Sequence, residues 1–309
     1  MTTLYVSHEA CLNHLNPPGH PERPERLRAI ERALANPRFA PLVRKEAPMA
    51  EIEQAALCHP KAYVEHVRAA TPREGMVRLD ADTSLSSGSF EAAMRAVGGG
   101  LLAVDQVIAG KADNAFVAVR PPGHHAETAK PMGFCLLNSA ATAARYAQQK
   151  HGIGRVALVD FDVHHGNGSQ EIFWADSSVL YCSSHQMPLY PGSGARGERG
   201  AHDTIVNAPL RQGDGGKAFR EAYETAILPR VEQFSPELIV ISAGFDAHAH
   251  DPLAGLELLE EDFAWVTRKL MDLAAGSAQG RIVSMLEGGY DVDALGSSVA
   301  VHIDALMHG

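Results

Sequence analysis

The sequence predicts a single α/β domain built on a parallel sheet with helices on both faces. Short apolar segments alternate with longer amphipathic segments along the 309 residues. Three of the short segments, VALVD at 156–160, ELIVIS at 237–242 and RIVSML at 281–286, are apolar almost without interruption. Such runs are typical of strands that are buried on both faces by helices. No Pro- or Ser-rich linker divides the chain, so we expect one domain over residues 1–309.

The individual elements follow from the same alternation. Strands are expected at 4–7, 115–119, 156–160, 179–183, 204–207, 238–242 and 282–286, and helices at 23–34, 61–70, 89–108, 139–150, 216–233, 260–274 and 292–307. Ser139 is predicted to cap the N-terminus of the Ala-rich helix behind it. Residues 187–203 are rich in Gly and Pro and predict a long loop, and long ordered loops in compact domains are usually functional.

The composition excludes several classes of protein. With 27 Lys and Arg against 37 Asp and Glu, the net charge is −10, which argues against nucleic acid as a partner. This balance would suit a cationic substrate, although solubility alone also produces it. No apolar run is long enough to span a membrane, so no membrane partner is expected. The composition leaves open whether the chain forms a homo-oligomer.

The N-terminus and the cysteines bear on the cellular compartment. The first residues, MTTLYVSHEAC, lack the basic and apolar regions of a secretory signal. The four cysteines are far apart and form no CxxC motif, which argues against a disulfide scaffold and against a cysteine zinc site. We therefore predict a reducing, cytoplasmic location.

Polar residues follow four of the predicted strands directly. These loops are RPPGHH at 120–125, FDVHHGNG at 161–168, AGFDAH at 243–248 and EGGYD at 287–291. In open parallel sheets, ligands bind beyond the carboxyl ends of the strands. The sequence therefore predicts one site to which four separate loops contribute.

A metal centre is predicted from Asp162, His164 and Asp246. Asp162 and His164 are two residues apart, so in an extended segment their side chains point to the same side. Asp246 follows another strand and completes a set of two carboxylates and one imidazole. Three protein ligands with an open fourth position are typical of catalytic zinc. Taken alone, the Asp-x-His pair could equally be a turn with a hydrogen-bonded histidine.

The adjacent histidines His124 and His125 are candidates for proton transfer. A rigid Pro-Pro-Gly turn precedes them. An acceptor behind each ring would fix its tautomer and raise its basicity, and Asp160 and Asn167 are the natural candidates. The alternative is a pair of surface histidines without a catalytic role.

Tyr290 is a candidate for stabilising negative charge. It follows Gly288 and Gly289, which give the backbone the freedom to direct the phenol inward. Its hydroxyl could donate a hydrogen bond to an oxyanion opposite the metal. Without the neighbouring loops, a core tyrosine would be the default interpretation.

Taken together, these motifs resemble a known family. The chain contains RPPGHHA at 120–126, MGFCLLN at 132–138, VDFDVHHGNGSQ at 159–170, YPGSG at 190–194, GFDAH at 244–248 and LEGGYD at 286–291, preceded by HPERPERL at 20–27. This set resembles the zinc-dependent histone deacetylase and acetylpolyamine amidohydrolase superfamily, and MGFCLLN with HHGNG resembles its class II branch. The resemblance implies the arginase–deacetylase fold, with an eight-stranded parallel sheet.

The resemblance also implies roles for individual residues. The ligands of one Zn²⁺ per chain fall on Asp162, His164 and Asp246. The histidine dyad falls on His124 and His125, supported by Asp160 and by Asn167, where the class I branch has aspartate. The tyrosine that polarises the carbonyl falls on Tyr290.

Further positions implied by the resemblance line the substrate tunnel or bind monovalent cations. The substrate-binding positions are Phe134 with Gly133, Tyr190 in place of the usual phenylalanine, the rim carboxylate Asp82, and Leu253. An inner K⁺ or Na⁺ site falls on Asp160, Asp162, His164, Ser183 and Ser184, and an outer one lies near Phe173 and Val179.

The implied reaction is hydrolysis of an N-acetyl or other N-acyl amide on a primary amine at the end of a long chain, which releases acetate and the free amine. The substrate would be acetyl-lysine in a protein or peptide, or an acetylpolyamine. Leu253 follows Asp251-Pro252, where polyamine-specific relatives have glutamate, and this favours acetyl-lysine. A silent acyl-lysine-binding protein is the non-enzymatic alternative. The ligand set accepts either zinc or ferrous iron.

Overall fold

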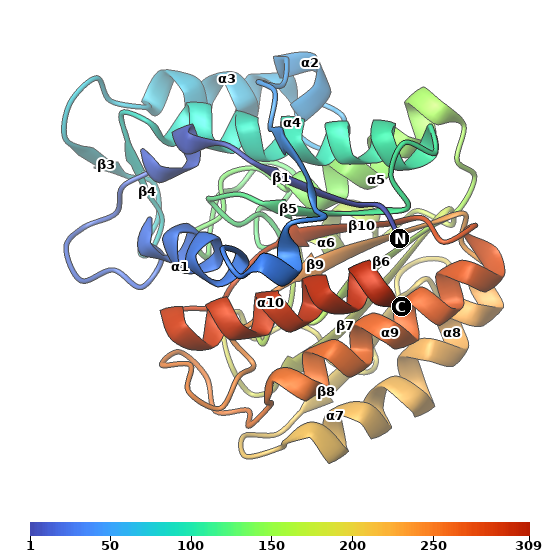
Figure 1. Ribbon diagram of the computed structural model, residues 1–309. Coiled ribbons are helices and arrows are strands. Elements are labelled where there is room, and N and C mark those ends of the chain that lie inside the picture. The colour runs from blue at the N-terminus through green and yellow to red at the C-terminus, as the bar shows by residue number, and fades with distance from the viewer.

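Eight strands form the central sheet of the computed structural model, which describes residues 1–309 (Figure 1). Their spatial order is β2 (Val43–Glu46), β1 (Thr3–Ser7), β5 (Asn114–Ala118), β10 (Ile282–Leu286), β9 (Leu238–Ala243), β6 (Val156–Asp160), β7 (Val179–Gln186) and β8 (Ile205–Leu210). All neighbouring strands of this sheet pair in parallel. The prediction of a parallel sheet is therefore confirmed.

Helices cover both faces of the sheet, as predicted (Figure 1). One face carries α2 (Ile52–Ala55), α3 (Lys61–Ala70), α4 (Ser89–Ile108) and α5 (Ser139–His151), and the other carries α1 (Glu25–Leu34), α7 (Gly216–Ala222), α8 (Leu228–Phe234), α9 (Glu260–Ser277) and α10 (Val292–His308). The short α6 (Asn167–Phe173) follows β6, and β3 (Met76–Arg78) pairs with β4 (Ser84–Ser86) in a separate antiparallel ribbon. A core of buried apolar side chains lies between the layers.

The structure differs from the predicted elements in several places. The short helices α2 and α6 and the ribbon of β3 and β4 were not predicted. The edge strand β2 was not predicted either, because its sequence VRKE is charged and exposed, as edge strands often are. The predicted helix at 216–233 is α7 and α8 joined by a π-helical turn at Tyr223–Ile227. Ser139 is not the cap of α5: Asn138 is the N-cap, and its Oδ1 accepts a hydrogen bond from Ala141 N at 3.0 Å.

Other expectations concern the loop, the cysteines and the membrane. Residues 187–203 contain no helix or strand, as predicted. All four cysteines are free and buried. None of the helices combines the length and the apolar character that crossing a membrane requires.

The buried His302 makes the fold sensitive to acid. Its ring lies within hydrogen-bond distance of the hydroxyls of Thr267 and Ser284, and burial lowers the pKa of His302 to about 3. The unfolded chain, with a histidine pKa of about 6.5, binds this proton first as the pH falls. This histidine therefore destabilises the fold below about pH 6.5, by about 1.4 kcal/mol per pH unit.

The His302→Gln variant tests this effect. Urea unfolding at about pH 7 and pH 5 should show a stability loss that is about 2 kcal/mol smaller in the variant than in the wild type. The control is His66→Gln, at an exposed position of α3, whose pH dependence should match the wild type. Equal pH dependence of His302→Gln and the wild type would contradict the prediction.

Candidate metal centre

The four polar loops meet because their strands are neighbours. β5, β10, β9 and β6 are consecutive in the sheet and run in the same direction. Their carboxyl ends therefore lie along one short stretch of the sheet edge, and the loops that follow them enclose one site. The sequence predicted the convergence of the loops but not the strand order that produces it.

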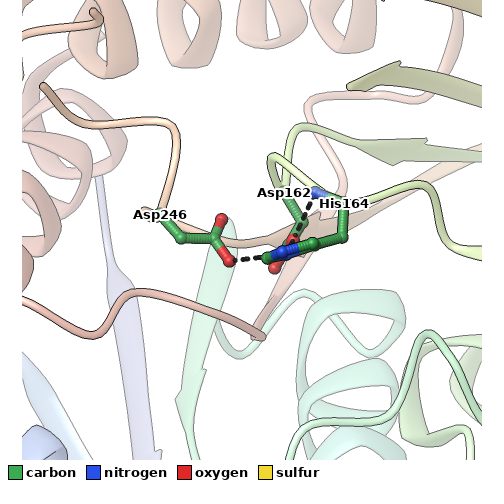
Figure 2. A group of neighbouring side chains, drawn as sticks. All are labelled: Asp162, His164 and Asp246. Atoms are coloured by element: carbon green, nitrogen blue, oxygen red, sulfur yellow. Dashed lines mark hydrogen bonds and ion pairs between the residues drawn. The ribbon is translucent and has the colours of Figure 1, made fainter. Parts of the chain in front are cut away.

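Asp162, His164 and Asp246 lie together and point toward one another (Figure 2). One ligand atom from each lies within 4.8 Å of the other two, and all three residues are buried. His164 Nδ1 is 3.2 Å from Asp162 Oδ1 and 3.2 Å from Asp246 Oδ2. These oxygen and nitrogen atoms could therefore bind a single metal ion.

Main-chain amides hold the two carboxylates in place. Asp162 Oδ2 accepts from Gly288 N at 2.8 Å, and Asp246 Oδ1 accepts from Val163 N at 2.9 Å. Gly288 has to be glycine, because a Cβ there would lie only 2.1 Å from Asp246 Oδ2. The amides orient the carboxylates so that Asp246 Oδ2 faces His164.

The electrostatics of the centre favour a cation. Burial and the negative charge of Asp162 raise the pKa of Asp246 above its usual range. Burial lowers the pKa of His164, but hydrogen bonds to both carboxylates outweigh it and raise this pKa to about 10. Two buried carboxylates this close are costly unless a positive charge lies between them. The donor set and its charge thus fit a divalent metal ion.

The two histidines each contact a different acceptor. His124 Nδ1 lies 3.0 Å from Asp160 Oδ2, and His125 Nδ1 lies 2.8 Å from Asn167 Oδ1. The ring centroids of the two histidines are 4.0 Å apart, and both residues are buried. The structure therefore brings each histidine to the acceptor that the sequence suggested for it.

The surroundings move the pKa values of the two histidines in opposite directions. Burial lowers the pKa of His124, but the negative charges of Asp162 and Asp160 outweigh it and raise this pKa well above the usual value. Burial and the positive charge of His124 lower the pKa of His125 well below the usual value. Opposite shifts in neighbouring groups are typical of acid–base sites.

Tyr290 is only 7% exposed, and it lines a cavity that His125 and His164 also line. Its amide donates to Asp251 Oδ2 at 2.7 Å, and its ring contacts Phe134 edge to face, with the centroids 5.8 Å apart. The Arg26 guanidinium lies over the same ring, 4.9 Å from its centroid. The main chain and the ring are thus fixed from three sides.

A narrow cavity of about 170 Å³ leads to the centre. Its lining contains every substrate-binding position that the sequence suggested, three candidate catalytic or metal-ligating residues, and Leu189, which was not predicted. The lining residues are Asp82, His125, Gly133, Phe134, His164, Leu189, Tyr190, Leu253 and Tyr290. Asp82 Oδ1 accepts from Gly133 N at 3.1 Å, which joins the rim carboxylate to the wall. Gly133 and Phe134 both have positive φ angles, of 57° and 68°.

Of the positions suggested for monovalent cations, Asp162 and His164 belong to the candidate metal centre itself, and the others lie on β6, α6 and β7. Asp160 and Ser183 are paired neighbours on β6 and β7, and Ser184 follows on β7. All three are buried. Phe173 at the end of α6 and Val179 at the start of β7 are also fully buried, and they could offer only main-chain oxygens to a cation.

Three supporting residues were not predicted from the sequence. Glu287 Oε2 accepts from Gly123 N at 2.6 Å and His124 N at 3.1 Å, so it holds the loop of the histidine pair. Arg26 Nε donates to Gly289 O at 2.6 Å and Asp251 accepts from Tyr290 N, and both contacts hold the tyrosine loop. Only the position of Glu287, directly after a buried strand, signalled its role.

The chain is similar to proteins of known family. A family model described as histone deacetylase domain matches residues 20–306. The chain belongs to the histone deacetylase family. A histone deacetylase-like amidohydrolase of Pseudomonas aeruginosa is 40% identical over 277 residues, which cover 88% of this chain and 73% of the relative. A probable deacetylase of Archaeoglobus fulgidus is 38% identical over 315 residues, which cover 100% of this chain and 87% of the relative.

Two further comparisons bear on fold and location. The crystal structure of the HDA15 HD domain matches with a TM-score of 0.93 and 36% identity over 99% of this chain and 88% of that one, which confirms the fold. The chloroplastic histone deacetylase 10 of Oryza sativa is 38% identical over 305 residues, which cover 92% of this chain and 69% of the relative. Because a histone deacetylase-family relative is named chloroplastic, the cytoplasmic location stays a prediction.

Proposed function

We propose that this histone deacetylase-family protein hydrolyses N-acetyl amides on lysine side chains of proteins or peptides. The observation that carries the proposal is the buried Asp162–His164–Asp246 cluster at a narrow cavity walled by Phe134 and Tyr190. A cavity of about 170 Å³ suits a slender unbranched chain rather than a bulky side chain. An acylated amine at the end of four methylene groups has this shape.

We propose that one Zn²⁺ ion binds between these three residues. Two carboxylates and one imidazole are common zinc ligands, and a three-residue set keeps a position open for chemistry. When bound, zinc would polarise the acyl carbonyl and lower the pKa of water to about 7. Metal analysis of the protein as purified from its source, with zinc and iron compared, would identify the ion.

The protein groups around this centre have distinct roles in the proposal. His125, which is held neutral, would take the proton of the attacking water and pass it to the leaving amine. His124, supported by Asp160, would add positive charge near the reacting atoms. Tyr290 would donate a hydrogen bond to the developing oxyanion. Phe134 and Tyr190 would hold the methylene chain.

We also propose an inner K⁺ or Na⁺ ion at Asp160, Asp162, His164, Ser183 and Ser184, and an outer ion near Phe173 and Val179. The support for the inner ion is the position of Asp160 beside Ser183 in paired, buried strands directly behind the metal ligands. A cation there would offset part of the buried carboxylate charge.

The choice between acetyl-lysine and acetylpolyamine depends on the cavity rim. Leu253 lines the cavity and adds an apolar side chain, whereas a polyamine carries extra ammonium groups that would favour a carboxylate at this position. We therefore expect kcat/KM to be at least about 100-fold higher for an acetyl-lysine peptide than for N-acetylated putrescine, cadaverine or spermidine. The reverse preference would make the protein an acetylpolyamine amidohydrolase.

The Leu253→Glu variant tests the role of the rim directly. It should raise kcat/KM for N-acetylspermidine by about 10-fold, because a partly buried ion pair at the rim contributes roughly 1.4 kcal/mol. The matched control is Leu253→Gln, which adds similar size and polarity without the charge and should give no such gain. An equal response of both variants would show that charge at position 253 does not set the preference.

A further inference from the structure

The catalytic role proposed for His125 requires a particular tautomer. Its Nε2 atom must carry a lone pair, so the ring proton must be on Nδ1, which faces Asn167. A carboxylate at position 167 would enforce this, because it only accepts hydrogen bonds. An amide can present either its oxygen or its NH₂ group, so Asn167 by itself leaves the tautomer of His125 undetermined.

Glu127 removes this ambiguity. Its Oε1 lies 2.8 Å from Asn167 Nδ2, and the main-chain oxygen of His125 lies 3.4 Å from the same nitrogen. A carboxylate and a carbonyl can only accept, so the NH₂ group has to face them. Asn167 Oδ1 is then the atom directed at His125 Nδ1, 2.8 Å away, and His125 Nδ1 must carry the proton.

The surrounding structure fixes Glu127 for this contact. Glu127 N donates to Lys130 O at 3.0 Å and closes a tight turn. Thr128 N and Oγ1 donate to Glu171 Oε2 at 2.8 and 2.5 Å, which joins the turn to α6, the helix that begins at Asn167. Glu127 lies at an outer cavity of about 430 Å³, separate from the substrate cavity. It thus reaches Asn167 from the side opposite the reacting groups.

We propose that Glu127 is a positioning residue, which orients the Asn167 amide and thereby holds His125 in the tautomer with a free Nε2. The proposal rests on the proposed function, because His125 is the base only if the protein is an amidohydrolase. It also explains how an asparagine can occupy the position behind a catalytic histidine. The chain still supplies a carboxylate, that of Glu127, but this carboxylate contacts Asn167 rather than the ring of His125.

The tautomer can be observed without any substrate. In zinc-loaded protein with ¹⁵N-labelled histidine at about pH 8, NMR should show a proton on His125 Nδ1 and none on Nε2. The signals are assigned by their loss in His125→Ala. Glu127→Ala should give a mixture of tautomers or broadened signals. An unchanged Nδ1–H signal in Glu127→Ala would overturn the proposal.

Kinetics provide the second readout. Glu127→Ala should lower kcat for the acetyl-lysine peptide by about 10- to 100-fold with KM little changed, as is typical when an outer partner of a catalytic histidine is lost. The matched control is Glu171→Gln, which removes one negative charge at the same outer cavity but retains an acceptor for Thr128. A similar kcat loss in this control would show that charge alone, rather than orientation, is responsible.

Exchanging the amide and the carboxylate between positions 167 and 127 tests the proposal most directly. Asn167→Asp should lower kcat, because two carboxylates would then face each other at the 2.8 Å contact. Adding Glu127→Gln should restore most of the activity, because the glutamine NH₂ can donate to the new carboxylate at position 167 while that carboxylate accepts from His125. A double variant no more active than Asn167→Asp would overturn the proposal. If the wild type turns over no acyl amide, the proposed function fails, and the NMR result alone decides the positioning role.

Discussion

Replacing Tyr290 by phenylalanine is expected to lower kcat by about 10²- to 10³-fold, with little change in KM for an acetyl-lysine peptide. The loss corresponds to removing one donor to an oxyanion, about 3 to 4 kcal/mol. The ring should stay in place, because it packs against Phe134 and under the Arg26 guanidinium without using its hydroxyl. The main-chain contact with Asp251 is also unaffected by the change.

The measurement combines steady-state kinetics with metal analysis of the same samples. The variant should bind as much metal as the wild type, because Tyr290 is not among the three proposed ligands. The control is Tyr146→Phe, which removes a hydroxyl that donates to Asp105 between α5 and α4, away from the site, and should leave kcat unchanged. Near-normal turnover of Tyr290→Phe would refute the oxyanion role, and loss of metal would show a structural role instead.

The site could be predicted from the sequence to the extent that its residues follow buried strands. Asp162, His164 and Asp246 come after strands whose apolar runs are continuous, so their place at the sheet edge follows from local sequence. Residues that act through contacts with distant parts of the chain do not follow such strands, so the local sequence did not indicate their place at the site. Arg26 bonds to Gly289, 263 positions away, and nothing near Arg26 in the sequence indicates this partner.

Competition between similar residues explains why the predicted cap of α5 differs from the observed one. Asn138 and Ser139 are both good caps, and the sequence cannot show which of them lies before the first helical residue. The tertiary structure decides, because Asn138 Nδ2 also donates to Ser169 Oγ at 3.0 Å. Likewise, the partner of Asn167 could not be assigned from sequence, since Glu127 reaches it only through the turn that follows the histidine pair.

The buried arginines near the site need a buried carboxylate to neutralise their charge. Glu22 is fully buried and contacts both Arg26 and Arg120, so one carboxylate serves two buried guanidinium groups. The charge of Arg120 outweighs burial and lowers the pKa of Glu22 well below its usual value. Loss of Glu22 would leave both buried arginines without a carboxylate partner, and Arg26 is the residue that holds the tyrosine loop.

Asp246→Asn is expected to abolish metal binding while stabilising the metal-free protein. The asparagine Oδ1 can still accept from Val163 N, so the loop after β9 should keep its conformation. The loss of one of three proposed ligands should weaken zinc affinity far beyond the about 10- to 100-fold typical of an outer hydrogen-bond partner, so the variant should not retain the ion. Activity should fall with metal content.

The metal-free variant is expected to be more stable than the metal-free wild type, because Asp246 is a buried carboxyl beside Asp162. Burial and that neighbouring charge raise the pKa of Asp246 above the unfolded value of about 3.9, so ionisation favours the unfolded chain as the pH rises above this value. Asparagine does not ionise, and at about pH 7 the metal-free variant should unfold at higher urea than the metal-free wild type.

Added zinc should reverse this order, because only the wild type gains the stability of a bound ion. Urea unfolding of both proteins, with chelator and with excess zinc, shows whether zinc reverses their order of stability. Lower stability of metal-free Asp246→Asn than of the metal-free wild type would show that carboxylate repulsion is not what the metal relieves. Full zinc occupancy of the variant would refute Asp246 as a ligand.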